Sequence, residues 1–232
     1  MLHTLKATRG MVSAPHHLAA QSGLAVLREG GNAIEATLAA AATLAVVHPH
    51  LSGLGGDGFW LIAEPGKVPI SIDGSGAAAA AALPALYRGH GLGAIPAHGP
   101  LAALTVAGTV SGWQAAQEMA SRWDGRLPLA RLFEDAIHYA RNGSPVSDHQ
   151  ACAAEALWPA LAGHGALVEG FGVLGEPPQA GREQKQPALA DTFGRLATRW
   201  ARPSAPNCSA RAVRWARPIW PGIARCGAGR CR

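Results

Sequence analysis

Apolar and small residues recur at helical spacing near the start of the chain. In the first segment they lie three or four positions apart: Ala20, Gly23, Leu24 and Leu27. This spacing predicts a half-buried helix that begins near Pro15 and stops at Gly30-Gly31. Asn32 is then a good N-cap for a second helix over residues 33–47, which is apolar or small on nearly every face and is expected to pack on both sides.

The pattern changes from helical to extended after the glycine-rich run 51–58. So many glycines indicate positive φ angles or backbones too close for a Cβ atom. Residues 59–64 and 68–73 then read as strands around the turn Pro65-Gly66-Lys67, which predicts an antiparallel hairpin. Residues 74–83 are Gly, Ser and Ala followed by Leu, a composition that fits either a loop or the start of a helix.

Further helices are expected in the second half. Ser111 can cap a helix with one apolar face, formed by Trp113, Ala116, Ala120 and Trp123. Pro128 opens another amphipathic helix, which Asn142-Gly143 ends. Residues 179–186 read as a polar loop.

Charge divides the chain near residue 194. Residues 1–194 hold 11 Lys and Arg against 15 Asp and Glu, a net charge of −4, whereas residues 195–232 hold 9 Arg and no acid, which gives the whole chain +5. The tail has no helical or strand period. We therefore expect a domain at 1–194 and a basic low-complexity tail at 195–232, which is disordered or results from a reading-frame shift in a GC-rich gene. Cys152 is the single cysteine before the tail, which argues against a domain built on disulfides.

Three ordered blocks connect the chain to a known family. They are residues 12–47, residues 52–59 (SGLGGDGF) and residues 105–113 (TVAGTVSGW). Over about Gly10 to Leu196 the chain resembles the N-terminal part of the large subunit of the γ-glutamyltransferase (γ-glutamyltranspeptidase) family, with features of the branch that contains oxamate amidohydrolase. The tail does not match.

The resemblance implies an α+β fold, namely a partial αββα sandwich of the N-terminal nucleophile hydrolase type, truncated before the nucleophile-bearing subunit. Members are made as proenzymes that cut themselves into two subunits, and the exposed threonine attacks a γ-glutamyl or related amide. No threonine here lies in the family's processing context, so no catalytic residue is carried over and the chain is expected to be inactive alone. The implied partners are a small-molecule amide substrate and the missing small subunit, and no cofactor is implied.

One substrate residue of the family can be sought in this part. The resemblance implies an arginine just after the second strand, which holds the α-carboxylate of a glutamyl group. Residues 72–78 (IDGSGAA) stand there instead, and no arginine follows until Arg88. By position alone, Asp73, Ser75 and Gly76 are the candidate substrate-binding residues. Because a carboxylate is best held by a guanidinium, the missing arginine weakens the case for a γ-glutamyl substrate. Both γ-glutamyl compounds and oxamate stay open as substrates of the intact protein.

Other motifs favour structural interpretations. Gly53, Gly55 and Gly58 match a dinucleotide-binding pattern, but a strand follows them where a helix is required. The pairs His16-His17 and His48-x-His50 have no third ligand at a recognisable spacing, so no metal site is predicted. Asp57 is interpreted as a turn-capping carboxylate. Ser75 and Ser111 lack the setting of a nucleophile and are interpreted as turn and cap residues.

Two alternatives to an amide hydrolase fragment remain. One is a non-catalytic binding fragment, and the other is a nucleic-acid-interacting protein whose arginines and tryptophans in the tail pair with phosphates and stack on bases. The tail has no lysine, repeat or RGG-like pattern, which argues against nucleic acid. The first residues contain no apolar core of an export signal, and residues 33–47 are too short to span a bilayer, so we expect a cytoplasmic protein without a membrane partner.

Overall fold

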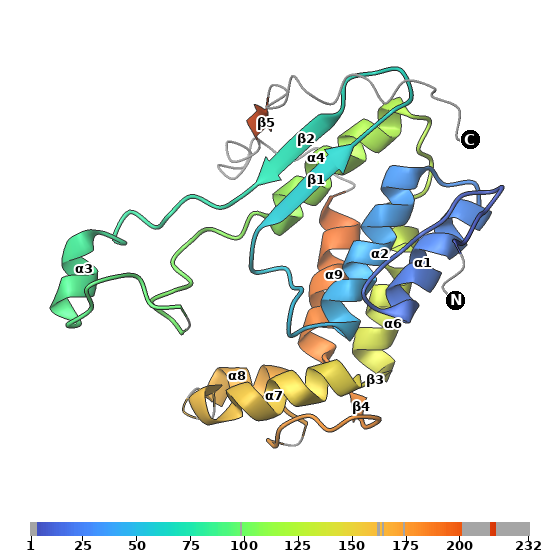
Figure 1. Ribbon diagram of the computed structural model, residues 1–232. Helices are drawn as coiled ribbons and strands as arrows, with labels where there is room; N and C mark the ends of the chain where they lie inside the picture. Colours follow the sequence, from blue (N-terminus) through green and yellow to red (C-terminus); the bar gives the residue numbers. More distant parts are fainter. Residues whose placement is uncertain are drawn as a thin grey trace, which may run out of the picture. The chain divides into compact units, whose positions relative to one another are not determined.

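The computed structural model describes residues 4–97, 99–161, 163, 165–173 and 175–200, and the backbone of residues 214–216. The chain divides into two compact units, one formed by residues 1–54 and 117–207 and the other by residues 55–116 and 208–232. Helices and strands are both present, as the predicted α+β class requires (Figure 1). Within the described residues, no helix has the length and apolar character needed to cross a membrane.

The first unit is mainly helical. Its helices are α1 (His17–Arg28), α2 (Ala33–Val47), α5 (Leu129–Leu132), α6 (Glu134–Asn142), α7 (Asp148–Leu161), α8 (Gly165–Phe171) and α9 (Pro187–Arg199). The strands β3 (Ser144–Pro145) and β4 (Glu183–Gln184) form a short antiparallel pair. Strand β4 lies inside residues 179–186, which were predicted to be only a polar loop. The pairing depends on residues about 40 positions away, which explains why local polarity did not reveal it.

Helix α2 is the centre of this unit and packs against α1, α5 and α6. Most of its side chains are buried on every face, as its uniform apolar pattern predicted. Helix α1 approaches it closely at Gly23, where an added Cβ would lie 2.8 Å from the carbonyl oxygen of Ala36. A hydrogen bond of 3.0 Å between the hydroxyls of Thr43 and Ser22 joins the two helices in the buried interface.

The start of α2 is held by a capping box. The side-chain oxygen of Asn32 accepts hydrogen bonds from the backbone N–H groups of Ile34 and Glu35, and Glu35 accepts one from the N–H of Asn32 in return. The amide nitrogen of Asn32 also donates to the carbonyls of Ala120 and Trp123. The predicted cap is therefore confirmed, and it also fastens α2 to a distant segment.

The helix predicted from Pro128 to Asn142 is divided in two. Phe133, with φ −98° and ψ 0°, separates α5 from α6. Its ring is fully buried, with its centroid 5.3 Å from that of Phe193 in α9. The prediction of one helix was wrong because helical periodicity does not report a tertiary contact of this kind. The predicted end is correct, since Gly143 follows α6 with a φ of 106°.

The second unit contains an antiparallel sheet with the order β1 (Gly58–Ile62), β2 (Ile70–Gly74) and β5 (Arg214–Ala216). The predicted hairpin is confirmed, although its strands are shifted and its connection is wider than predicted. Glu64 and Lys67 close a turn within this connection, with Gly66 at a φ of 77°. Helix α3 (Pro84–Gly89) lies in the long excursion between β2 and α4 (Thr109–Arg122) (Figure 1). The undecided stretch 74–83 is mainly irregular, with one bridge from Ala78 to Thr105.

Helix α4 (Thr109–Arg122) begins in this unit and runs into the other. Its first turns cover one face of the hairpin, because an added Cβ at Gly112 would lie 3.6 Å from the indole nitrogen of Trp60. Ser111 was predicted to cap this helix, but the helix starts two residues earlier, and the Ser111 hydroxyl donates to the carbonyl of Gly108. That prediction was wrong because the carbonyl of Gly56, outside the helix, accepts hydrogen bonds from the N–H groups of Gly108 and Thr109. This long-range contact is not visible in the local sequence.

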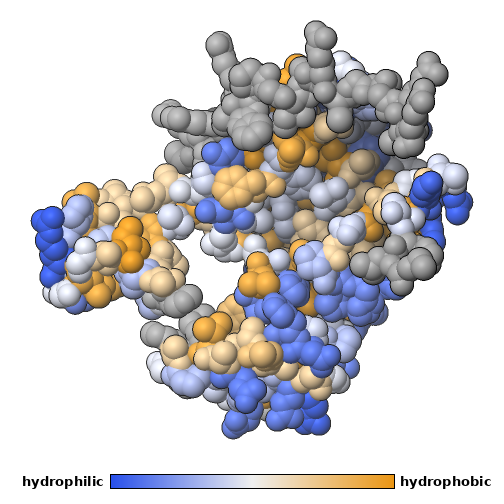
Figure 2. All heavy atoms as spheres, in the orientation of Figure 1, coloured by the Kyte–Doolittle hydropathy of each residue, from blue (hydrophilic) through white to orange (hydrophobic). Residues whose placement is uncertain are grey.

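The other face of the hairpin is apolar and open. Phe59 and Leu61 of β1 are 69% and 77% exposed, and hydrophobic residues are visible over the hairpin in Figure 2. The predicted basic tail at 195–232 lies outside the described residues except for the end of α9, Trp200 and the backbone of β5, so its disorder or frameshift origin stays a prediction. In the sheet register, Arg214 of β5 is opposite Asp73.

Candidate functional site

The predicted substrate-binding residues follow directly from the end of β2. Asp73 pairs with Phe59 in the hairpin register, and one oxygen of its carboxylate accepts a 2.9 Å hydrogen bond from the backbone N–H of Ser75. This bond closes an Asx turn at the end of β2. The next amide, that of Gly76, donates to a carboxylate oxygen of Asp57 at 3.0 Å. Two carboxylates thus hold two successive amides of the loop, and this hydrogen bond joins Asp57 to a segment 19 residues away and not, as the sequence had suggested, to its own turn.

Three segments meet at this loop: residues 56–58, 74–76 and 106–109, which we call the glycine junction. The carbonyl of Gly56 accepts from the N–H groups of Gly108 and Thr109, at 3.0 Å each, and from the Thr109 hydroxyl at 2.8 Å. Thr109 is buried, with 5% exposure. Sequence reasoning did not single out Thr109, although it lies within the TVAGTVSGW block.

The glycines of the junction are required by close backbone contacts. An added Cβ at Gly76 would lie 1.6 Å from the carbonyl oxygen of Val106, and one at Gly108 would lie 1.9 Å from that of Gly74. Real Cβ atoms do not approach so closely, so neither position accepts a side chain without movement of the backbone. By contrast, Gly53 and Gly55 have open space where a Cβ would be, and the run leads into β1. The dinucleotide pattern therefore has the wrong order of elements in the structure also.

The glycine junction offers partly exposed hydrogen-bonding groups along the loop 73–76. Asp73, Ser75 and Gly76 are partly exposed, and the Ser75 hydroxyl can donate or accept. Arg88, the next arginine in the chain, is exposed in α3. Such a site can orient a small polar molecule through hydrogen bonds, but it contains no activated nucleophile of the kind that amide hydrolysis needs.

A second group of polar side chains lies in the helical unit. His48 caps the C-terminal end of α2, His50 follows in the next turn, and His149 lies in the first turn of α7. We call these three residues the imidazole cluster, because one ring nitrogen from each of them lies within 4.8 Å of the others. The Nε2 atom of His50 is 2.7 Å from the Nδ1 atom of His149. The sequence showed no third histidine at a recognisable spacing from His48-x-His50, and the fold supplies one that lies 99 residues from His50.

Burial lowers the pKa of the inner imidazoles. The pKa of His50 falls to about 4, first because the ring is desolvated and then because of the neighbouring His48 and His149. The pKa of His48 is lowered for the same first reason, followed by the effect of His149. These two rings are consequently neutral near pH 7.

The other histidine pair has a structural role. His16 is the N-cap of α1, and its Nδ1 atom accepts a 3.3 Å hydrogen bond from the N–H of Leu18. Its ring is stacked on that of His17, with centroids 4.7 Å apart. Burial, followed by the charges of His17 and His48, lowers the pKa of His16. His16 therefore caps α1 and His17 stacks on it at the helix start, which agrees with the structural interpretation that the sequence favoured for this pair.

Comparison with known proteins places this geometry in a family. The model described as Gamma-glutamyltranspeptidase matches residues 19–203. The chain is 54% identical over 192 residues to the oxamate amidohydrolase proenzyme of Klebsiella pneumoniae, a match that covers 82% of this chain and 36% of that protein. It is 38% identical over 193 residues to the glutathione hydrolase-like YwrD proenzyme of Bacillus subtilis, covering 83% of this chain and 36% of that protein.

The fold agrees with these matches. The crystal structure of Helicobacter pylori gamma-glutamyltranspeptidase superposes with a TM-score of 0.76 at 30% identity, over 84% of this chain and 56% of that one. The chain spans about a third of the length of the two curated relatives. With a family model over most of its length and the same α+β fold, the chain belongs to the γ-glutamyltranspeptidase family.

Proposed function

We propose that this chain forms the large-subunit framework of an amide hydrolase whose substrate is a small amide, with oxamate as the first candidate. The observation that carries the proposal is the 54% identity to an oxamate amidohydrolase proenzyme over a stretch that includes the loop 73–76. In that loop the chain has Asp-Gly-Ser-Gly where the family resemblance implies an arginine for a glutamyl carboxylate. A site without this guanidinium suits a substrate that lacks a glutamyl group.

Asp73, Ser75 and Gly76 are proposed to contact this substrate. Asp73 holds the N–H of Ser75 with one carboxylate oxygen and so positions the backbone that carries the Ser75 hydroxyl. The Ser75 hydroxyl can donate to a carboxyl oxygen. Gly76 places the loop against Val106, so that the two polar side chains are held on a fixed backbone.

The open face of the hairpin is proposed to receive the remainder of the protein. Phe59 and Leu61 are largely exposed there, on the side opposite α4. In a sandwich of two sheets such a face is covered by the second sheet. The small subunit that carries the nucleophile is the occupant that the family's two-subunit organisation supplies.

A direct assay tests whether catalysis needs that subunit. The purified 232-residue chain is incubated with oxamate and with a γ-glutamyl anilide, and release of ammonia and of the aniline is measured. We expect neither product and no self-cleavage. Turnover by the isolated chain would show that the reacting groups lie within these residues and would refute this part of the proposal.

A chimera tests the substrate. Residues 10–196 replace the matching region of the Klebsiella proenzyme, and the unaltered proenzyme serves as the positive control. We expect self-cleavage and hydrolysis of oxamate, with a raised KM in the Ser75→Ala chimera and an unchanged KM in the Ser71→Ala chimera, since Ser71 lies on the same strand before the loop. A chimera that cleaves itself but hydrolyses only the γ-glutamyl anilide would favour a glutamyl substrate instead. The expected cytoplasmic location is tested separately by cell fractionation.

A further inference from the structure

The imidazole cluster has the composition and spacing of a metal site. Three imidazoles suit divalent transition metals, zinc among them, and a site with three protein ligands leaves a fourth position for water. Zinc–nitrogen bonds of about 2.0–2.1 Å in a tetrahedral site place ligand nitrogens roughly 3.3 Å apart. One ring nitrogen from each of the three histidines lies within 4.8 Å of the others, so small rotations of the side chains bring them to that spacing.

The inner rings contain polar atoms that the protein leaves unsatisfied. The Nδ1 atoms of His48 and His50 are buried and have no hydrogen-bond partner among the described residues. His48 is only 6% exposed as a whole. A buried polar nitrogen without a partner costs free energy, and coordination of an ion by the rings is a way to recover it.

The ligands come from positions that the fold holds firmly. His48 ends α2, and its carbonyl accepts hydrogen bonds from the N–H groups of Leu51 and Ser52, which shapes the turn that carries His50. On the other side, Gln150 is buried next to His149, and its side chain donates to that of Gln184 at 2.6 Å. Gln184 in turn donates to the carbonyl of Phe171. These bonds hold the start of α7 against β4, and the side chain of Gln186, just after β4, donates to the carbonyl of Val46 near the end of α2 at 2.8 Å.

We propose that His48, His50 and His149 bind one divalent transition-metal ion, with Zn²⁺ as the ion to test. His149 is exposed, so an ion can enter from solvent on its side. Each neutral imidazole directs a lone pair to the ion and keeps its proton on its other nitrogen, so a change of tautomer is enough. The ion then ties the end of α2 to the start of α7.

Zinc titration of the full chain tests the proposal. The chain carries no polyhistidine tag, and all four cysteines are replaced by serine so that thiols in the tail cannot hold the ion. We expect one Zn²⁺ per chain by calorimetry and a rise in Tm on zinc addition. His149→Gln should weaken zinc binding by at least about tenfold. The matched control is His138→Gln, which changes another exposed histidine on a helix and should leave zinc affinity unchanged.

Spectroscopy with Cu²⁺ provides a readout that does not depend on stability. Electron paramagnetic resonance should show nitrogen couplings from imidazole ligands in the starting chain and a loss of one nitrogen in His149→Gln. If zinc neither binds nor raises Tm, the cluster is a packing contact and the proposal is wrong. Equal zinc affinity in the His149 and His138 variants would likewise refute it, because binding would then occur elsewhere.

Discussion

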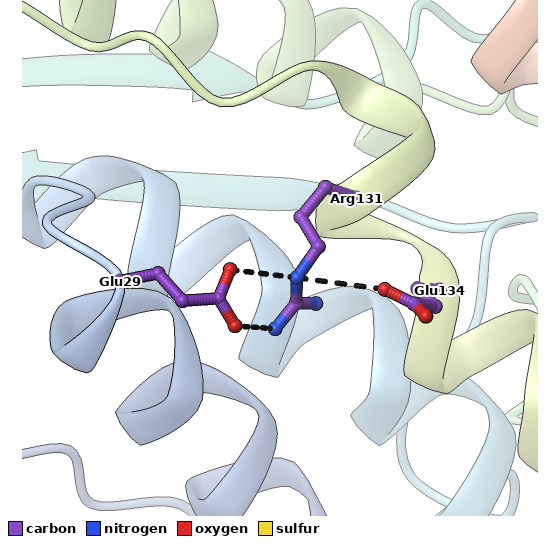
Figure 3. Close-up of polar contacts among 3 residues, drawn as sticks. All are labelled: Glu29, Arg131 and Glu134. Atoms are coloured by element: carbon purple, nitrogen blue, oxygen red, sulfur yellow. Dashed lines mark hydrogen bonds and ion pairs between the residues drawn. The ribbon is translucent and has the colours of Figure 1, made fainter.

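The carboxylate of Glu29 is held by the guanidinium of Arg131, a residue 102 positions away in the chain. The Nε atom of Arg131 donates to one oxygen of Glu29 at 2.8 Å, and a terminal nitrogen of the same group donates to the other oxygen (Figure 3). Glu134 lies on the opposite side of the guanidinium, with its Oε2 atom 3.4 Å from the Nε atom of Arg131. This bidentate pair joins the end of α1 to α5.

The pair predicts a pH-dependent contribution to stability. The hydrogen bond from Arg131 lowers the pKa of Glu29 below its ordinary value. A carboxyl group whose pKa is lower in the folded state stabilises the protein above its unfolded pKa, roughly 4.3, and loses that effect as pH falls through its folded pKa. Because Glu29 is 42% exposed, we expect the contribution to be below about 1 kcal/mol.

Urea unfolding of the Glu29→Gln variant at several pH values measures this contribution. The difference from the starting chain should be constant between about pH 5.5 and 7.5 and should shrink below about pH 4.3. It should also decrease in high salt. Glu134→Gln is the control, with a smaller effect because its contact with Arg131 is longer and not bidentate. A difference that grows as pH falls would contradict the assignment.

The capping box at Asn32 predicts a larger loss of stability. Asn32→Ala removes the acceptor for two backbone N–H groups and also the donor to the carbonyls of Ala120 and Trp123. We expect unfolding to become easier by about 2 kcal/mol. Thr37→Ala on the same helix should change the unfolding free energy by less than about 0.5 kcal/mol, because Thr37 is exposed and bonds only within the helix.

A third variant separates the two functions of Asn32. Serine keeps an N-cap acceptor but lacks the amide donor, so Asn32→Ser should lie between the starting chain and Asn32→Ala. If serine and alanine destabilise equally, the long-range donors matter more than the cap does.

The glycine junction predicts that alanine is far more destabilising at a glycine inside the junction than at one just outside it. Gly76→Ala places a Cβ 1.6 Å from the carbonyl of Val106, so the backbone must move, and we expect a loss of about 3 kcal/mol in urea unfolding. Gly55→Ala has no atom within 4 Å and should be neutral or slightly stabilising. Equal effects at both positions would show that the three segments are not in contact in solution.

The open hairpin face predicts self-association of the isolated chain. Phe59 and Leu61 are exposed on β1, which has a single partner strand among the described residues, and an apolar strand at a sheet edge promotes aggregation. Leu61→Lys should therefore increase the monomer fraction in size-exclusion chromatography. Leu5→Lys is the control, since Leu5 is 79% exposed but lies outside the hairpin. An equal gain from both substitutions would indicate a general effect of charge.

The sequence by itself determined the elements whose causes are local. Helix α2 extends over residues 33–47 as predicted, because its apolar pattern and the Asn32 cap lie within a few residues of the bonds they make. The hairpin and the end of α6 at Gly143 follow from turn residues in the same way. The three sequence blocks also identified the family, because several similar blocks in the same order can be recognised without knowing how the chain folds.

Only the tertiary structure decided which distant residues meet. His149 joins His48 and His50 because α7 begins beside the end of α2, and no periodicity in the sequence encodes that neighbourhood. The break at Phe133 and the contact of Gly76 with Val106 arise in the same way from packing between separate segments. Local patterns set backbone conformation through nearby hydrogen bonds, whereas sites form where the folded chain brings remote side chains within a few ångströms.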